Sequence, residues 1–235
     1  MSLLLALLLA AQDAPVEVPS EVLRCASDNS VDAVLCRAVV AQGEDRFTDS
    51  AEAFEEAAGL AAADPDKASR ALLAGANMWL AAGNAERAGA AIDKALAIDA
   101  LDSVQRGFAH LDRARAALMG GNSAMASDHL ERARALVPAD PWVWYLGAGI
   151  ALEDEDLITA RQQIAQALVL APDSGDVLLR AAAIEAAAEN LEGARAHLQK
   201  VREVAPGSAA ERTAIRLLQT LSEPAAVPTP FTDEE

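Results

Sequence analysis

Histidines and a run of carboxylates are the side chains of this sequence whose chemistry first suggests a functional site. Imidazoles transfer protons near neutral pH and bind transition metals. However, His110, His129 and His197 are scattered on different parts of the chain, without the partner spacing of a metal or acid–base site. Four successive carboxylates, Glu153 to Asp156, could attract Ca²⁺, but the spaced ligands and glycine of a calcium loop are missing. We interpret this run as a solvated turn.

Other catalytic patterns are missing from the sequence as well. Serine or cysteine nucleophiles with a base, paired catalytic carboxylates and a phosphate-binding glycine motif cannot be assembled from it. The sequence therefore predicts a protein that is not an enzyme and that needs no cofactor and no metal.

The two cysteines, Cys25 and Cys36, suggest a structural disulfide. They flank Asp28, Asn29 and Ser30, which are typical of turns and helix N-caps. If one helix ends near Ser27 and another begins after Ser30, the two sulfurs meet across a tight helical hairpin. An oxidising compartment would then join them. The alternative is two reduced, buried cysteines that behave as small hydrophobic residues.

The N-terminus carries an uncharged Leu/Ala run, Met1 to Ala11. As a helix it would span only ~16 Å, about half of a bilayer core, so we expect no membrane-spanning segment in the mature chain. The run is followed by small residues and a polar segment, which favours a signal peptide at 1–12, cleaved between Ala10 and Ala14. We therefore expect a periplasmic or secreted protein. The alternative is a cytoplasmic protein whose N-terminus forms a buried first helix.

Composition limits the classes of fold and partner. The chain has 36 acidic and 19 basic side chains, a net charge of −17, which argues against nucleic-acid binding. Hydrophobic residues make up 52% and aromatic residues 3%, so the apolar content is mainly Ala and Leu, typical of an all-helical protein. Residues 13–66 contain 13 acidic and 3 basic side chains, which marks an acidic N-terminal flank. This flank either steers partners or folds over a groove, or it is simply a solvated surface.

An internal repeat of 34 residues is the strongest pattern in the sequence. It aligns four segments, 69–102, 107–140, 141–174 and 175–208. The eighth and twentieth places always hold Ala, the twenty-fourth holds Ile or Leu, and the twenty-seventh holds Ala or Val. Small residues at these places let two antiparallel helices pack closely, and Pro138, Pro172 and Pro206 end the second helix. Each unit leaves an apolar face that only the next unit can cover.

This unit resembles the tetratricopeptide repeat in length, in its small residues and in its terminal proline. Trp144 stands where that family often has Trp, and Gly83-Asn84 and Gly121-Asn122 stand at the turn between helices. Ala100 departs from the pattern at the Pro place, and Glu155 and Glu189 at the turn Gly. The resemblance implies an all-α fold, a right-handed α-solenoid of helix-turn-helix repeats.

Three segments flank the four repeats. Residues 31–66 look like a degenerate fifth unit with a longer turn, inside the acidic flank 13–66. Residues 209–222 fit a capping helix in which Ile215, Leu218 and Leu221 cover the last apolar face. Between the first two repeats we expect a four-residue insertion at 103–106. Residues 223–235 are Pro-rich and acidic, which predicts a disordered tail.

The resemblance also implies a site, because the first helices of such repeats line a concave groove that binds peptides or protein segments. Carried over place by place, it gives these groove candidates: Arg70, Leu73, Asn77, Phe108, Leu111, Arg115, Met119, Trp142, Tyr145 and Leu179. The alternative is that these side chains pack between neighbouring helices. Trp79 and Trp144 fall at places that predict core packing instead.

We therefore expect a non-catalytic scaffold that binds an unidentified protein or peptide partner in the concave groove, in the cell envelope. Two alternatives stay open at this point. One is a self-associating assembly element, and the other is a cytoplasmic adaptor with an uncleaved N-terminus.

Overall fold

The computed structural model describes residues 25–221, and throughout this range the regular structure is helical. The signal peptide predicted at 1–12 and the tail predicted at 223–235 lie outside the described residues. None of the helices between residues 25 and 221 is long and apolar enough to cross a membrane. The helices are α1 (Val31–Gly43), α2 (Phe47–Leu60), α3 (Pro65–Ala81), α4 (Ala85–Ala97), α5 (Ser103–Met119), α6 (Ser123–Leu136), α7 (Pro141–Glu153), α8 (Leu157–Leu170), α9 (Gly175–Ala187), α10 (Leu191–Val204) and α11 (Ala209–Thr220).

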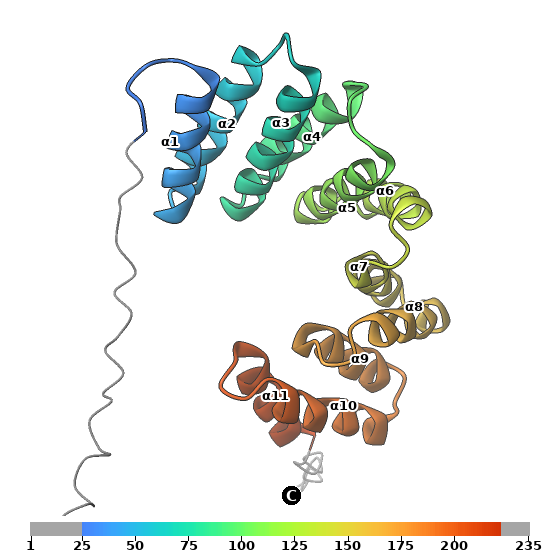
Figure 1. The fold of residues 1–235 in the computed structure, drawn as a ribbon. Helices are drawn as coiled ribbons and strands as arrows, with labels where there is room; N and C mark the ends of the chain where they lie inside the picture. Colours follow the sequence, from blue (N-terminus) through green and yellow to red (C-terminus); the bar gives the residue numbers. More distant parts are fainter. Residues whose placement is uncertain (1–24, 222–235) are drawn as a thin grey trace, which may run out of the picture.

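Successive helices pair into five hairpins, from α1/α2 to α9/α10, and α11 closes the C-terminal end. The hairpins stack side by side into an open arch (Figure 1). In this arch α5, α7 and α9 lie on the inner side, and their partners α6, α8 and α10 lie on the outer side (Figure 1). The architecture predicted from the repeat is therefore confirmed.

The small and aliphatic residues of the repeat form the cores of the hairpins. None of the residues at the eighth, twentieth, twenty-fourth and twenty-seventh places is more than 4% exposed. These residues are Ala76, Ala88, Ile92, Ala95, Ala114, Ala126, Leu130, Ala133, Ala148, Ala160, Ile164, Ala167, Ala182, Ala194, Leu198 and Val201. Such small side chains allow close helix packing, so the low aromatic content costs the fold little.

The hairpin α1/α2 repeats this arrangement as the degenerate fifth unit. Ala38, Ser50, Phe54 and Ala57 stand at the equivalent places and are all buried. The hydroxyl of Ser50 donates a hydrogen bond of 2.8 Å to the carbonyl of Ala38, which satisfies a polar side chain at a place where the other units have Ala.

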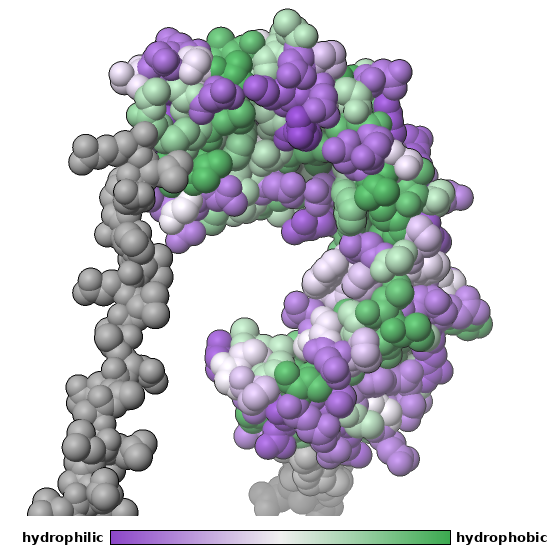
Figure 2. Space-filling view, viewed as in Figure 1, coloured by the Kyte–Doolittle hydropathy of each residue, from purple (hydrophilic) through white to green (hydrophobic). Residues whose placement is uncertain are grey.

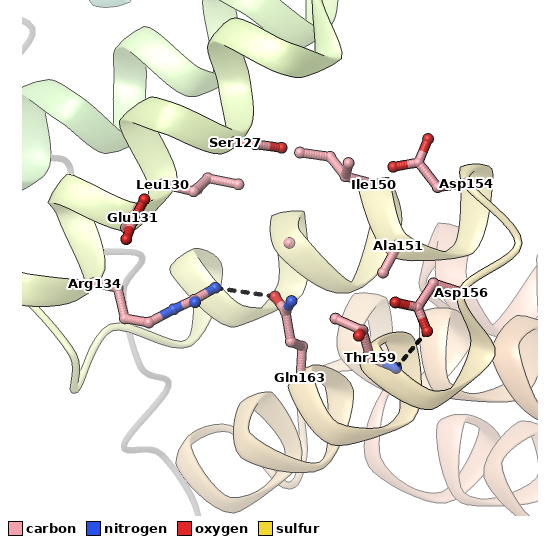
Figure 3. Close-up of a pocket in the computed structure, with 11 residues that line it drawn as sticks. Ser127, Leu130, Glu131, Arg134, Ile150, Ala151, Asp154, Asp156, Thr159 and Gln163 are labelled. Atoms are coloured by element: carbon pink, nitrogen blue, oxygen red, sulfur yellow. Dashed lines mark hydrogen bonds between the residues drawn. The ribbon is translucent and has the colours of Figure 1, made fainter.

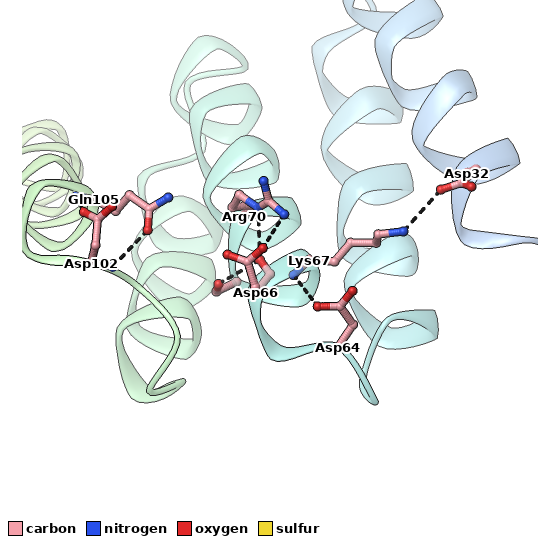
Figure 4. A network of polar contacts seen from close by, with 8 residues as sticks. Asp32, Asp64, Asp66, Lys67, Arg70, Asp102 and Gln105 are labelled. Carbon is pink, nitrogen blue, oxygen red and sulfur yellow. Dashed lines mark hydrogen bonds and ion pairs between the residues drawn. The ribbon is translucent and has the colours of Figure 1, made fainter.

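Two first helices begin one turn earlier than the repeat pattern predicted at Ser69 and Gly107. The Asp64 carboxylate caps α3 by accepting from the amide of Lys67, and Asp102 caps α5 in a capping box with Gln105 (Figure 4). Residues 103–106, predicted as an insertion between units, therefore form the first turn of α5. N-cap hydrogen bonds determine where a helix starts, whereas the small residues determine only where it packs.

The turns inside the hairpins share one backbone conformation. Gly83 and Gly121 have a φ of 75°, and Asp45, Glu155 and Glu189 adopt the same left-handed region at 56°, 60° and 58°. This confirms that Glu155 and Glu189 replace the turn glycine. The longer turn predicted for the first unit is wrong, because Glu44–Arg46 has the same length as Ala82–Asn84.

The capping helix α11 covers the last hairpin with two of the three residues predicted for this contact, Leu218 and Leu221. Ala214 is fully buried against the core of the last unit, and Leu218 and Leu221 pack beside it. Ile215, predicted to cover this face, is 38% exposed, because the side chain next to Ala214 points about 100° away around the helix.

The N-terminal end is held by a disulfide between Cys25 and Cys36. Cys36 lies in the middle of α1, but Cys25 lies in a segment without helical structure, so the helical hairpin predicted to bring the sulfurs together is wrong. Arg37 fixes the same segment by donating to the carbonyls of Ala26 and Asp28 at 3.2 and 3.0 Å. Ser30 then caps α1.

Candidate partner-binding groove

A cavity of about 450 Å³ opens between α5 and α7, the helices at the centre of the inner side of the arch. The inner side of the arch encloses an open hollow, which is visible in the space-filling view (Figure 2). Four residues that the sequence placed in the groove line this cavity together with Leu146; they are Leu111, Arg115, Trp142 and Tyr145. The structure thus brings two of the three aromatic candidates and one arginine to a single place.

The aromatic pair is positioned by the start of α7. Asp140 caps this helix by accepting a 2.8 Å hydrogen bond from the amide of Trp142, and Pro141 occupies the first helical position. Trp142 and Tyr145 are three residues apart on one face, and their rings meet edge to face with centroids 4.9 Å apart. Trp142 remains 40% exposed, so it can contact a partner.

Arg115 is held in position by a carboxylate on its own helix, α5. Its guanidinium donates to Asp112 at 3.0 Å. Burial raises the pKa of Asp112, and this effect outweighs the opposing charge and hydrogen bond of Arg115 and the hydrogen bond of Asn77. About half of the Arg115 side chain is still exposed at the cavity.

Arg180 reaches the same aromatic pair from α9. Its guanidinium carbon lies 4.3 Å from the centroid of the Tyr145 ring, a cation–π contact. The path of this side chain crosses α7 at Gly149, where an added Cβ would lie 1.9 Å from the nearer guanidinium nitrogen. Within residues 25–221 no carboxylate forms an ion pair with Arg180. The place-by-place comparison missed Arg180, because it stands one place after the groove-facing fifth place.

Phe108 and Met119 expose apolar surface on α5. They are 44% and 49% exposed, and their spacing from Arg115 puts all three on one face of the helix. They do not line the cavity itself.

The other candidates are placed elsewhere by the structure. Arg70 turns back to Asp66 in the first turn of α3 (Figure 4), and the Asn77 amide donates to the carbonyl of Leu73 at 3.2 Å. Leu73 and Leu179 are half-buried and pack against the cores of the first and last units, so we interpret them as packing residues rather than groove contacts.

The two tryptophans predicted to pack in the core differ in burial. Trp79 is 2% exposed, its indole N–H donates to Glu55 at 2.9 Å, and Arg87 stacks 3.7 Å over its ring. Trp144 is only half-buried, with its indole N–H donating to the carbonyl of Pro138 at 2.8 Å. Both side chains pack between neighbouring helices, and Trp142 is the tryptophan that lines the groove cavity.

A second cavity, of about 380 Å³, lies between α6, α7 and α8 (Figure 3). The Arg134 guanidinium donates to Gln163 at 3.1 Å, in space left by Gly147. Asp156, at the end of the acidic run, caps α8 by accepting from the amide of Thr159, and hydrogen bonds from Thr159 lower its pKa. The polar groups here hold helices together, and the acidic run ends α7 at Glu153 and forms the turn to α8.

The histidines are less scattered than the sequence suggested. His110 of α5 and His129 of α6 meet within one hairpin, with their Nδ1 atoms 3.0 Å apart. Burial, followed by the charges of His129 and nearby arginines, lowers the pKa of His110 to about 4, and burial also lowers the pKa of His129. Within the described part of the chain no third side chain joins them in a group able to hold a metal ion. Sequence spacing could not reveal this pair, because it forms across two helices.

The comparisons with known proteins identify the fold. No family model matches the sequence, and no curated protein matches it. Similar solved structures include PilF of Pseudomonas aeruginosa (20% identity, TM-score 0.65, 82% of each chain covered) and MamA of Desulfovibrio magneticus (19%, 0.63, 80% of this chain and 98% of that chain). A third is YrrB, described as a TPR protein with an unusual peptide-binding site (17%, 0.57, 81% of this chain and 93% of that chain). This protein therefore has the fold of the tetratricopeptide-repeat solenoids, a right-handed array of helical hairpins.

Proposed function

We propose that this protein is a non-catalytic scaffold that binds a segment of a protein partner on the inner side of its arch. The observation that carries the proposal is the cavity between α5 and α7, which gathers Leu111, Arg115, Trp142 and Tyr145. Exposed tryptophan, tyrosine and arginine side chains are the residues that contribute most to protein recognition surfaces. In a chain with only 3% aromatic residues, their concentration at one inner cavity supports a binding role.

The stacked hairpins suit this role because they hold the side chains in place before a partner arrives. Trp142 and Tyr145 share one face of α7, and Arg115 is held by Asp112. Since these side chains are already ordered, binding costs less conformational entropy. The similarity to YrrB, whose structure is described as having a peptide-binding site, is consistent with the same use of the fold.

We further propose that the protein acts outside the cytoplasm, in the periplasm or beyond. The apolar run from Met1 to Ala11 and the pairing of Cys25 with Cys36 support this location, because disulfides persist in oxidising compartments. N-terminal sequencing of the protein from its native host tests the proposal. A new N-terminus between Ala10 and Ala14 is expected, and an intact Met1 or Ser2 would contradict it.

The binding proposal is tested by replacing Trp142 and Tyr145 with alanine and measuring recovery of partners from an envelope extract. Trp142 is exposed and Tyr145 is half-buried, so the helical content should remain unchanged in circular dichroism. We expect the recovered partner to be lost. Replacing Ile158, which is 74% exposed on the outer helix α8, is the matched control. Equal recovery with the groove variant and the control would overturn the proposal.

A second candidate function is self-association through the C-terminal end. Ile215 and Leu217 of α11 are 38% and 41% exposed, although α11 is the helix that ends the stack. Exposed apolar side chains at a solenoid end favour stacking with another copy. Sedimentation over a range of concentrations separates the two functions, since a strict monomer rules out this one.

A further inference from the structure

We propose that the groove selects a partner segment in which an aspartate or glutamate stands beside a bulky apolar side chain. This inference rests on the proposed function and adds the chemistry of the partner. It follows from the charges that surround Trp142 and Tyr145, not from the shape of the arch.

Arg180 is the first residue that points to an acidic partner. It is fixed over the Tyr145 ring, in the space left by Gly149, yet no carboxylate between residues 25 and 221 pairs with it. A chain with 36 acidic side chains offers many carboxylates, and seven of the fifteen arginines between residues 25 and 221 form ion pairs with them. A guanidinium that is held in place without such a partner retains its hydrogen-bonding capacity for a carboxylate on another molecule.

Arg115 supplies a second cation on the opposite side of α7. It projects from α5 into the cavity, whereas Arg180 comes from α9, and both of these helices contact α7. Its partner Asp112 is half-buried, and burial raises the pKa of that carboxyl. Asp112 pairs with Arg115 and Asp140 lies at the amide of Trp142, so Arg180 is the cation near the aromatic pair that no carboxylate between residues 25 and 221 engages in an ion pair.

The cavity supplies the apolar half of the recognition. Leu111 and Leu146 form its wall, and Trp142 exposes 40% of its surface at the edge. A bulky apolar side chain buried here would gain hydrophobic free energy and place its neighbouring residue within reach of an arginine. Arg115 and Arg180 come from different helices rather than from one convergent cluster, which suits single carboxylates better than a phosphate group.

The experiment selects peptides from a phage-displayed library of random 12-residue sequences on the intact protein. Enriched sequences are synthesised with a fluorescent label, both as selected and with each Glu or Asp replaced by Gln or Asn. Their binding is then measured by fluorescence anisotropy on the wild type, Arg180→Gln, Trp142→Ala and Arg132→Gln. Arg132 is an exposed arginine on the outer helix α6, so its replacement removes one charge away from the groove.

We expect acidic residues next to aromatic or large aliphatic ones in the enriched peptides. Neutralising the acidic residue should weaken binding to the wild type by about five- to tenfold, as expected for a charge-assisted hydrogen bond. The same neutralisation should have little effect on Arg180→Gln, should retain its full effect on Arg132→Gln, and Trp142→Ala should lose binding of both peptide forms.

Two results would overturn the inference in distinguishable ways. Peptides that bind and depend on Trp142, but are not acidic or are unaffected by Arg180→Gln, contradict the acidic specificity and leave the groove intact. A library that yields no Trp142-dependent peptide on a folded protein contradicts the proposed groove itself.

Discussion

Gly149 of α7 leaves open the space through which Arg180 of α9 reaches Tyr145, because a Cβ at position 149 would lie 1.9 Å from the Arg180 guanidinium. This relationship joins the third and fourth clear repeats at the groove. A side chain added at position 149 can therefore move Arg180 without destabilising the helix that carries it.

Replacing Gly149 with Ala is therefore expected to leave the fold intact and to displace Arg180. Alanine favours a helix interior over glycine by roughly 0.8–1 kcal/mol, and the atom it displaces is the mobile end of a long side chain. The free energy of unfolding should stay equal or rise, while the preference for acidic peptides falls as in Arg180→Gln. A clear loss of stability together with unchanged peptide preference would show that Arg180 does not depend on this space.

The left-handed turn residues give a prediction on stability. Glu155 and Glu189 have φ values of 60° and 58°, a conformation that costs a non-glycine residue roughly 1–2 kcal/mol. Replacing either with Gly removes this strain but increases the freedom of the unfolded chain, so we expect a net gain of about 0.5–1 kcal/mol each. Gly83→Ala, at a φ of 75°, is the matched reverse change and should lower stability. Chemical unfolding followed by circular dichroism measures all three, and equal midpoints would refute the strain.

The His110–His129 pair predicts a pH dependence of stability. The pKa of His110 is about 4 in the fold, whereas an unperturbed histidine has a pKa of about 6.5. Between these values the unfolded chain binds the proton more readily, so this stability is complete above about pH 6.5 and is lost as the pH falls towards 4.

The measurement compares unfolding of the wild type and His110→Gln at several pH values. We expect the wild type to lose on the order of 2 kcal/mol more than the variant between pH 7 and 4. His197→Gln, on α10 and outside the pair, controls for the loss of a histidine elsewhere. Parallel curves for the wild type and His110→Gln would mean that the buried pair does not resist protonation.

The disulfide predicts the state of the thiols and the stability of the first hairpin. Protein purified without reductant from its native compartment should show no free thiol when denatured, since Cys25 and Cys36 are bonded. Replacing both with alanine opens a loop with a sequence separation of 11, and we expect a loss of about 2–3 kcal/mol. Two free thiols in the native protein would instead support reduced cysteines and a cytoplasmic location.

The repeat was determined by the sequence itself. Ala, Ile and Leu at fixed places specify which helix faces pack, because only small side chains permit such close approach. Glu155 and Glu189 could be assigned to the turn positions for the same reason: the period places them there whatever their own conformational preference. The helix starts at Pro65 and Ser103 were also encoded, in Asp64 and in the Asp102–Gln105 capping box, although the repeat period concealed them.

Only the tertiary structure decided which of the groove candidates meet. The repeat places predicted all three of Leu73, Leu179 and Trp142 as groove residues. Packing between units partly buries Leu73 and Leu179 but leaves Trp142 exposed. The contact of Arg180 with Tyr145 and the pair of His110 with His129 join residues on different helices. Such contacts depend on how the helices are placed relative to one another, which a periodic pattern along the chain does not specify.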